Sequence, residues 1–268
     1  MEARKPIIGM HFLGRKYTLG LAEVRSVDFW RAVFGEFVAT SFFLLTCLIG
    51  VWSPTNLVAG SLGTGLCIAL LVHMFDNISG GNINPAVSLA LVVNGQISLI
   101  RGGIYMVVQI LGSIAGAGVV NLITKSAPSG VNGTDVLHFD NCIPQMADEY
   151  EWQGMLYEFL FTSMLIMQVL RSTDSVRPVQ NGNIALAVGL VVVIANFCLI
   201  PITGGPVNPA RVTGPAVAGG KVGQLGYYWL GECAAAVITP LVYSPLLTRI
   251  NTIESPHDYT VQQKPDII

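Results

Sequence analysis

The sequence predicts an all-α membrane protein in which six transmembrane helices and two shorter half-helices form an inverted repeat. Three observations lead to this prediction. Hydrophobic residues make up 52% of the 268 residues and charged residues only 11%, a balance typical of helical membrane proteins. The tripeptide Asn-Pro-Ala occurs twice, 124 residues apart. Matching residues recur around both copies at offsets of 122 to 124 residues.

Each tripeptide has the pattern of a helix start, because Asn is a preferred N-cap and Pro is favoured at the first helical position. Apolar stretches follow over Val87 to Val93 and over Val212 to Ala218. Each is roughly ten residues long, about half of what a bilayer span requires. We therefore expect two half-helices. The candidate pore residues of the two motifs are Asn84, Pro85, Ala86, Asn208, Pro209 and Ala210.

Asparagine also brings a specific chemistry to these positions. Its carbonyl oxygen can cap the helix while its uncharged amide group stays free to donate a hydrogen bond. If the half-helices meet near the middle of the membrane, their positive N-terminal ends and the two amide donors converge. Such a site holds a neutral solute that carries oxygen, and it repels cations.

The full spans are expected at about residues 28–52, 57–75, 99–123, 152–170, 184–200 and 227–247. Comparison of the two halves shows a duplication in which Glu36 recurs as Glu158. In the same way Tyr105 and Gln109 correspond to Tyr228 and Glu232. Because each half holds three spans, the second half must be inserted upside down relative to the first, as in many transporters and channels.

This pattern divides the chain into an N-terminal tail (1–28), a channel domain (29–250) and a C-terminal tail (251–268), with repeats over about 29–123 and 152–247. The positive-inside rule places both tails in the cytoplasm, because eleven basic residues then face inward and only Lys125 and Lys221 face outward. Loop 124–151 is then extracellular. It contains Asn132 in a glycosylation sequon, although an unused sequon is an equally good interpretation.

The paired motifs, with Arg211 directly after the second, resemble the aquaporin (major intrinsic protein) family over about residues 29–250. The resemblance implies the aquaporin fold and a homotetramer with one pore per subunit. It also implies that Arg211 lines the narrowest constriction, where it donates hydrogen bonds and adds a barrier to cations and protons.

The other constriction residues depart from the water-selective pattern of the family. Counting from the motifs, Thr64 stands at the position that is usually aromatic in water channels, and Asn196 at the position that is usually histidine. The loop position of the constriction holds Gly205. None of the four histidines of the chain can replace the missing one. A ring of Thr, Asn, Gly and Arg should be wide and polar. If the alignment slips by one residue, Phe197 takes the place of Asn196.

Two further positions favour different subfamilies. Val212 stands where aquaglyceroporins usually carry Asp, whereas Tyr228 and Trp229 match an aromatic pair of water channels. We therefore expect a passive water channel, in the plasma membrane, with some permeability to small neutral solutes. The alternative is an aquaglyceroporin-like channel mainly for glycerol and urea. An ion-conducting protein and a non-conducting junctional protein of the same fold are weaker hypotheses.

Glu36 and Glu158 are ionisable residues inside predicted spans, which by default suggests function. A proton relay is one interpretation. Their symmetric placement favours another, in which both carboxylates support the re-entrant loops by accepting backbone hydrogen bonds. The sequence assigns no partner to Glu232. It shows no nucleophile with a base, no metal-ligand cluster and no phosphate loop, so we expect no enzyme activity and no cofactor. The expected partners are permeant molecules and the lipid bilayer, not nucleic acid.

Overall fold

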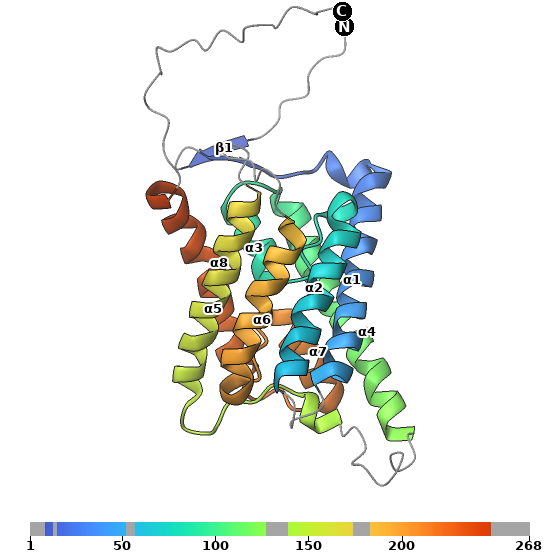
Figure 1. Cartoon of the computed structure of the whole chain (residues 1–268). Coiled ribbons are helices and arrows are strands. Elements are labelled where there is room, and N and C mark those ends of the chain that lie inside the picture. The colour runs from blue at the N-terminus through green and yellow to red at the C-terminus, as the bar shows by residue number, and fades with distance from the viewer. Residues whose placement is uncertain (1–8, 13–14, 52–56, 127–138, 174–182, 248–268) are drawn as a thin grey trace, which may run out of the picture.

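The structure is a computed structural model that describes residues 9–12, 15–51, 57–126, 139–173 and 183–247. Six long helices stand side by side around two short ones (Figure 1). The long helices are α1 (Val27–Val51), α2 (Leu57–Ser79), α4 (Leu99–Ser126), α5 (Glu151–Ser172), α6 (Ile184–Thr203) and α8 (Leu225–Leu247). The short ones are α3 (Pro85–Val93) and α7 (Pro209–Gly219). The predicted six spans and two half-helices are confirmed.

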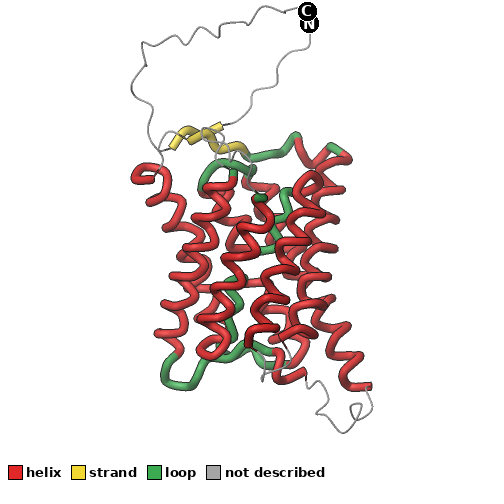
Figure 2. The backbone as a smooth tube through the Cα atoms, viewed as in Figure 1, coloured by secondary structure: helices red, strands yellow, loops and turns green. Residues whose placement is uncertain are grey.

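Five of the described helices, α1, α2, α4, α6 and α8, are long and apolar enough to cross a membrane. The exception is α5, which is as long as the others but carries Glu151, Glu158 and Arg171. It nevertheless stands in the same bundle, packed against α6 and α8. Figure 2 shows that it runs the full height of the bundle. We therefore count it as the sixth span.

Several helices extend a few residues beyond the ends that the sequence predicted, and two of these extensions belong to the functional site. Helix α2 continues to Ser79, and α6 continues through Pro201 to Thr203. A proline inside a helix removes a hydrogen bond and usually marks a helix end, but here Gly204, in the left-handed conformation, caps α6 after Thr203. Ser79 and Thr203 occupy equivalent positions of the two repeats. Both helices thus end at a hydroxyl side chain that the functional site uses.

The half-helices enter the bundle from opposite ends, and their N-terminal ends meet inside it (Figures 1 and 2). The asparagines of the two motifs bond to each other's loops, as described below. Helix α7 packs against α4, and α3 packs against α8 and α4. Each half-helix therefore contacts helices of both repeats.

The long helices approach closely where the sequence places glycine. A Cβ atom added at Gly65 on α2 would lie 2.5 Å from the carbonyl oxygen of Gly189 on α6, and one added at Gly189 would lie 2.4 Å from that of Gly65. These two glycines are equivalent in the two repeats. Their contact therefore joins the repeats backbone to backbone, as small residues do in membrane bundles.

The N-terminal region adds an element that the sequence did not predict. Strand β1 (Gly9–Phe12) pairs antiparallel with β2 (Arg15–Thr18), at the end of the bundle where α8 also ends (Figure 1). The Tyr17 hydroxyl donates to the Val93 carbonyl at 2.8 Å. An ion pair of 2.7 Å joins Arg101 to Glu23. The hairpin region is thus attached to the ends of α3 and α4. Asn132 lies outside the described residues.

The Gly65 contact gives a first prediction. Gly65→Ala places a methyl group against the backbone of Gly189 and should destabilise the protein by about 1–3 kcal/mol, the usual cost of overpacking. The measurement is thermal unfolding of the purified protein in detergent. Gly63→Ala is the matched control, because its Cβ meets nothing within 4 Å. Equal melting temperatures for the two variants would contradict the close packing.

Candidate functional site

The two Asn-Pro-Ala motifs bind each other through their asparagines. The side-chain oxygen of Asn84 accepts from the Ala86 amide at 2.8 Å, and that of Asn208 accepts from Ala210 at 2.9 Å. These bonds are the expected helix caps. In addition, Nδ2 of Asn84 donates to the Val207 carbonyl at 2.9 Å, and Nδ2 of Asn208 donates to the Ile83 carbonyl at 3.0 Å.

This second set of bonds corrects the expectation that both amide groups are free. An amide NH2 has two hydrogens, and one of each pair is already used by the opposite loop. Within the described part of the chain, the second hydrogen of each amide group has no acceptor.

The residues that accept these bonds have an unusual backbone conformation. Ile83 has φ = 56° and Val207 has φ = 42°. Positive φ is a genuine outlier for β-branched residues, and strain of this kind concentrates at functional sites. Because both residues immediately precede the asparagines, their conformation sets the direction in which each half-helix begins.

A buried carboxylate stabilises the strained loop of the first repeat. Glu36 is fully buried, and its two oxygens accept from four groups. The donors are the Ser79 hydroxyl (2.5 Å), the Asn82 amide (3.0 Å), the Ile83 amide (2.8 Å) and Nε2 of Gln109 (2.8 Å). Ser79 ends α2, Asn82 and Ile83 belong to the loop, and Gln109 lies on α4. The supporting interpretation of Glu36 therefore has a direct geometric basis.

The second repeat repeats this arrangement with changes. Glu158, also fully buried, accepts from the Thr203 hydroxyl and, at 3.0 Å, from the Val207 amide. The Asn208 amide donates at 2.8 Å to Glu232, for which the sequence gave no partner. Glu232 corresponds to Gln109 in the repeat, and this correspondence is the sequence signal for a side chain that supports the loop.

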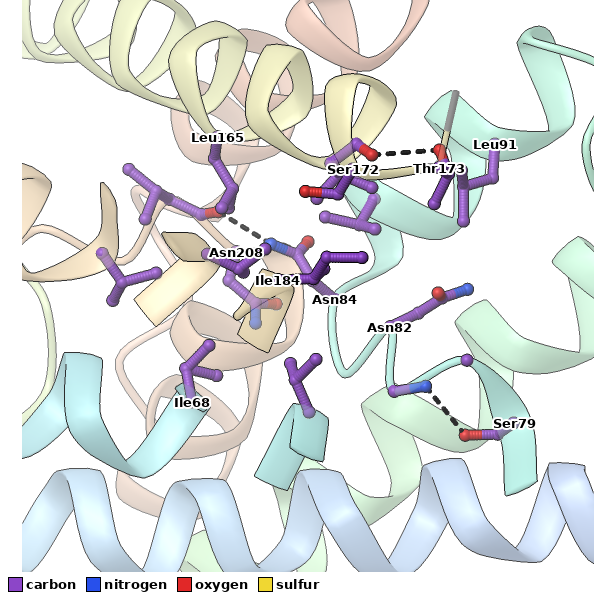
Figure 3. Close-up of a pocket in the computed structure, with 18 of the residues that line it drawn as sticks. Ile68, Ser79, Asn82, Asn84, Leu91, Leu165, Ser172, Thr173, Ile184 and Asn208 are labelled. Carbon is purple, nitrogen blue, oxygen red and sulfur yellow. Dashed lines mark hydrogen bonds between the residues drawn. The ribbon is translucent and has the colours of Figure 1, made fainter. Parts of the chain in front are cut away.

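On the α3 side of the asparagines the structure has a cavity of about 440 Å³. Figure 3 shows Asn84 and Asn208 at its inner end, with Ser172 and Thr173 among the other residues that line it. Most of the other lining side chains, such as Leu91, are apolar. The cavity is therefore an apolar chamber whose inner end is polar.

The four residues predicted to form the constriction lie outside this cavity, and all are buried. Thr64, Asn196 and Arg211 are only 3%, 1% and 2% exposed. The Thr64 hydroxyl lies 3.6 Å from the Cys47 sulfur. A Cβ atom on Gly205, where φ is +60°, would lie 3.5 Å from the Cα of Asn196. The structure thus brings Gly205 and Asn196 together.

Two polar atoms of this group have no hydrogen-bond partner among the described residues. They are Oδ1 of Asn196, an acceptor, and Nη1 of Arg211, a donor. The Nδ2 atom of Asn196 donates one of its hydrogens to the Val192 carbonyl at 2.9 Å. By contrast the Phe197 side chain is 36% exposed. Buried polar atoms without partners are rare and call for an explanation.

The repeat symmetry connects the constriction residues to the cavity. Shifting their numbers by the motif offset of 124 residues gives four positions in the other repeat. Thr64, Asn196, Gly205 and Arg211 map onto Val188, Val72, Gly81 and Val87, and all four of these line the cavity. The predicted constriction and the apolar chamber are therefore symmetry-related surfaces on opposite sides of the asparagine pair.

A six-helix membrane bundle with two half-helices that meet at paired asparagines defines a class of multi-pass membrane channels. The comparisons agree with this class. The family model described as "Major intrinsic protein" matches residues 23–243. The chain belongs to this family, that of the aquaporins, which are channels and not enzymes.

Among its relatives, mouse Aquaporin-4 is 37% identical over 226 residues, which cover 80% of this chain and 67% of that protein. The human lens fiber major intrinsic protein is 32% identical over 250 residues, 91% and 92% of the two chains. A solved aquaglyceroporin from Plasmodium falciparum superposes with a TM-score of 0.68 at 21% identity, covering 81% of this chain and 96% of that one. This last likeness shows the shared fold.

Removing the Glu36 carboxylate should destabilise the protein severely. In Glu36→Leu the four donors of this site lose their acceptor, and each unsatisfied buried donor costs about 1–3 kcal/mol. We expect little monodisperse protein on size-exclusion chromatography and a strongly lowered melting temperature. Asp28→Asn, on the same helix with an 89% exposed side chain, should change stability by about 0.5 kcal/mol or less. A Glu36→Leu variant as stable as the wild type would refute the supporting role.

Proposed function

We propose that the protein is a passive water channel with some permeability to small neutral solutes. The observation that carries this proposal is the pair of asparagines at the meeting point of the two half-helices. One free amide hydrogen on each, together with two positive helix ends, favours the oxygen of a neutral molecule and repels cations. On the α3 side of the asparagines, the apolar wall of the cavity offers few hydrogen-bonding groups that would hold a molecule back.

We propose further that Thr64, Asn196, Gly205 and Arg211 form the selectivity filter. The symmetry with four cavity-lining residues supports this assignment, and the exposed position of Phe197 argues against the shifted alignment. The unpaired Asn196 oxygen and Arg211 nitrogen suit a permeant molecule that both donates and accepts. Water, urea and glycerol all do so.

The burial of the filter bears on its width. The sequence suggested a wide ring, because it lacks the usual aromatic and histidine side chains. In the structure the three side chains are at most 3% exposed, so they are closely enclosed, which supports a filter narrower than the sequence suggested. Thr64 and Asn196 are still smaller than the aromatic and histidine side chains that they replace. We therefore retain glycerol and urea as secondary permeants. A channel mainly for these solutes remains the alternative function.

An ion-conducting or proton-relay function has less support. It would need the intramembrane carboxylates, yet the four bonds to Glu36 occupy both of its oxygens. It would also have to overcome the positive helix ends and Arg211. Currents under voltage clamp would favour this function.

Swelling of proteoliposomes tests the proposed function. We expect rapid swelling in hypo-osmotic medium and slower swelling in iso-osmotic glycerol and urea. Asn196→His should keep water flow and reduce glycerol and urea uptake to the rate of protein-free liposomes, since the larger ring fills the filter. Phe197→His is the matched control and should leave all three rates unchanged.

Each other outcome has a defined meaning. If Phe197→His removes solute uptake instead, the alignment of the filter is wrong by one residue. Uptake of solutes without water would favour the alternative function. No swelling in any medium would refute the channel proposal.

We also propose a homotetramer in the plasma membrane with both termini in the cytoplasm. The family resemblance supports the tetramer. The excess of basic residues at the hairpin end of the bundle, such as Arg31, Arg101 and Arg171, supports the orientation. We expect native mass spectrometry to show four copies, and we expect a C-terminal epitope tag to bind antibody only in permeabilised cells. A monomer would contradict the proposed tetramer. Antibody labelling of intact cells would contradict the cytoplasmic C-terminus.

A further inference from the structure

Glu232 on α8 is a fully buried carboxyl group beside a second one. Its Oε1 atom accepts from the Asn208 amide at 2.8 Å. Its Oε2 atom is buried and receives no hydrogen from the described residues. The Glu158 carboxyl group, on α5, holds the next amide along the chain: it accepts from the Val207 amide at 3.0 Å, and Val207 directly precedes Asn208. Both side chains are 0% exposed, so water does not separate their charges.

The equivalent place in the first repeat shows what this contact requires. There Nε2 of Gln109 donates to Glu36 at 2.8 Å and to the Ser88 hydroxyl at 2.9 Å. An amide supplies a hydrogen to the carboxylate, whereas an ionised carboxylate can only accept. If Glu232 were ionised, it would place an acceptor against an acceptor.

The loop of the second repeat does not make up for the missing donor. In the first repeat the Asn82 amide donates to Glu36 at 3.0 Å. The equivalent residue is Pro206, which has no N–H group. Glu158 therefore lacks both the backbone donor and the side-chain amide that serve Glu36. A hydrogen on the neighbouring carboxyl group would restore one of them.

The charges around the pair lead to the same conclusion. Arg211 on α7 is the cation that interacts with both carboxyl groups. The other titratable groups facing them are the Tyr228 hydroxyl, which donates to the Thr203 carbonyl, and the Cys233 thiol, both on α8. Two ionised carboxylates would leave one uncompensated buried charge, and like charges in such a site do not both ionise. One proton makes the cluster neutral.

We propose that Glu158 and Glu232 share one proton at neutral pH, and that Glu232 carries it as a carboxylic acid. Glu232 then donates to Glu158 as Gln109 donates to Glu36, while its other oxygen holds the Asn208 amide. It is a positioning residue for the second motif, and the proton takes the place of an amide hydrogen.

Infrared spectroscopy of the purified full-length protein at neutral pH tests this proposal directly. A protonated carboxyl group has a carbonyl band at higher wavenumber than carboxylate and amide bands. We expect one such band from a buried group in the wild type and its loss in Glu232→Gln, because the new amide lets Glu158 ionise. Gln109→Glu is the matched variant: it builds the same pair in the first repeat and should add a second band.

No such band in the wild type, or a band that persists in Glu232→Gln, would overturn the proposal. A Glu232→Gln protein that does not fold would overturn it too, because the amide is expected to replace the acid. Size-exclusion chromatography of the variant decides this point.

A second readout rests on the proposed function. Glu232→Gln should keep most of the water swelling that Glu232→Leu loses, at equal amounts of reconstituted protein. Equal losses in both variants would show that the donor is not what matters. The infrared result does not depend on permeation, so a protein that shows the band but does not swell would refute the channel proposal alone.

Discussion

The arrangement of the site depends on the left-handed backbone of Ile83 and Val207. Strain of this kind costs on the order of 1–3 kcal/mol per residue and persists only when the surroundings determine it from several sides. Here each residue is fixed twice. Its amide donates to a buried glutamate of the same repeat, Glu36 or Glu158. Its carbonyl accepts from the asparagine of the opposite repeat.

This double attachment explains why the two repeats must fold together. Each loop is held in part by the asparagine of the other repeat, so the full set of bonds forms only when both half-helices are in place. The Gly65–Gly189 contact also joins the two repeats, because it brings the backbones of α2 and α6 into close contact. The result is a preorganised site, in which the directions of both asparagine side chains are fixed by the fold.

Much of this architecture could be predicted from the sequence, and the exceptions have physical reasons. Hydropathy and the capping motifs located the eight main helices, because these signals are local. The ends of α2 and α6 were wrong because they are set by bonds of Ser79 and Thr203 to distant glutamates. The repeat pairs Glu232 with Gln109 and so points to a role beside the loop, but its partner, the Asn208 amide, depends on how α8 approaches the start of α7. The hairpin at residues 9–18 has no hydropathy signal at all.

The repeats differ most where selectivity is expected, and this difference is informative. Symmetry provides the scaffold: glutamate, hydroxyl, strained residue and asparagine occur in both halves. The positions equivalent to Thr64, Asn196 and Arg211 are valines, and they line a chamber of about 440 Å³. On the other side of the asparagines, polar residues replace these valines, and their side chains are buried. Glu232 belongs to the same polar side. An arginine in the first turn of a half-helix is electrostatically unfavourable, and the single negative charge that Glu158 and Glu232 carry together offsets it. The cation and the acid pair are therefore best understood as one unit, built into one half of an otherwise symmetric channel.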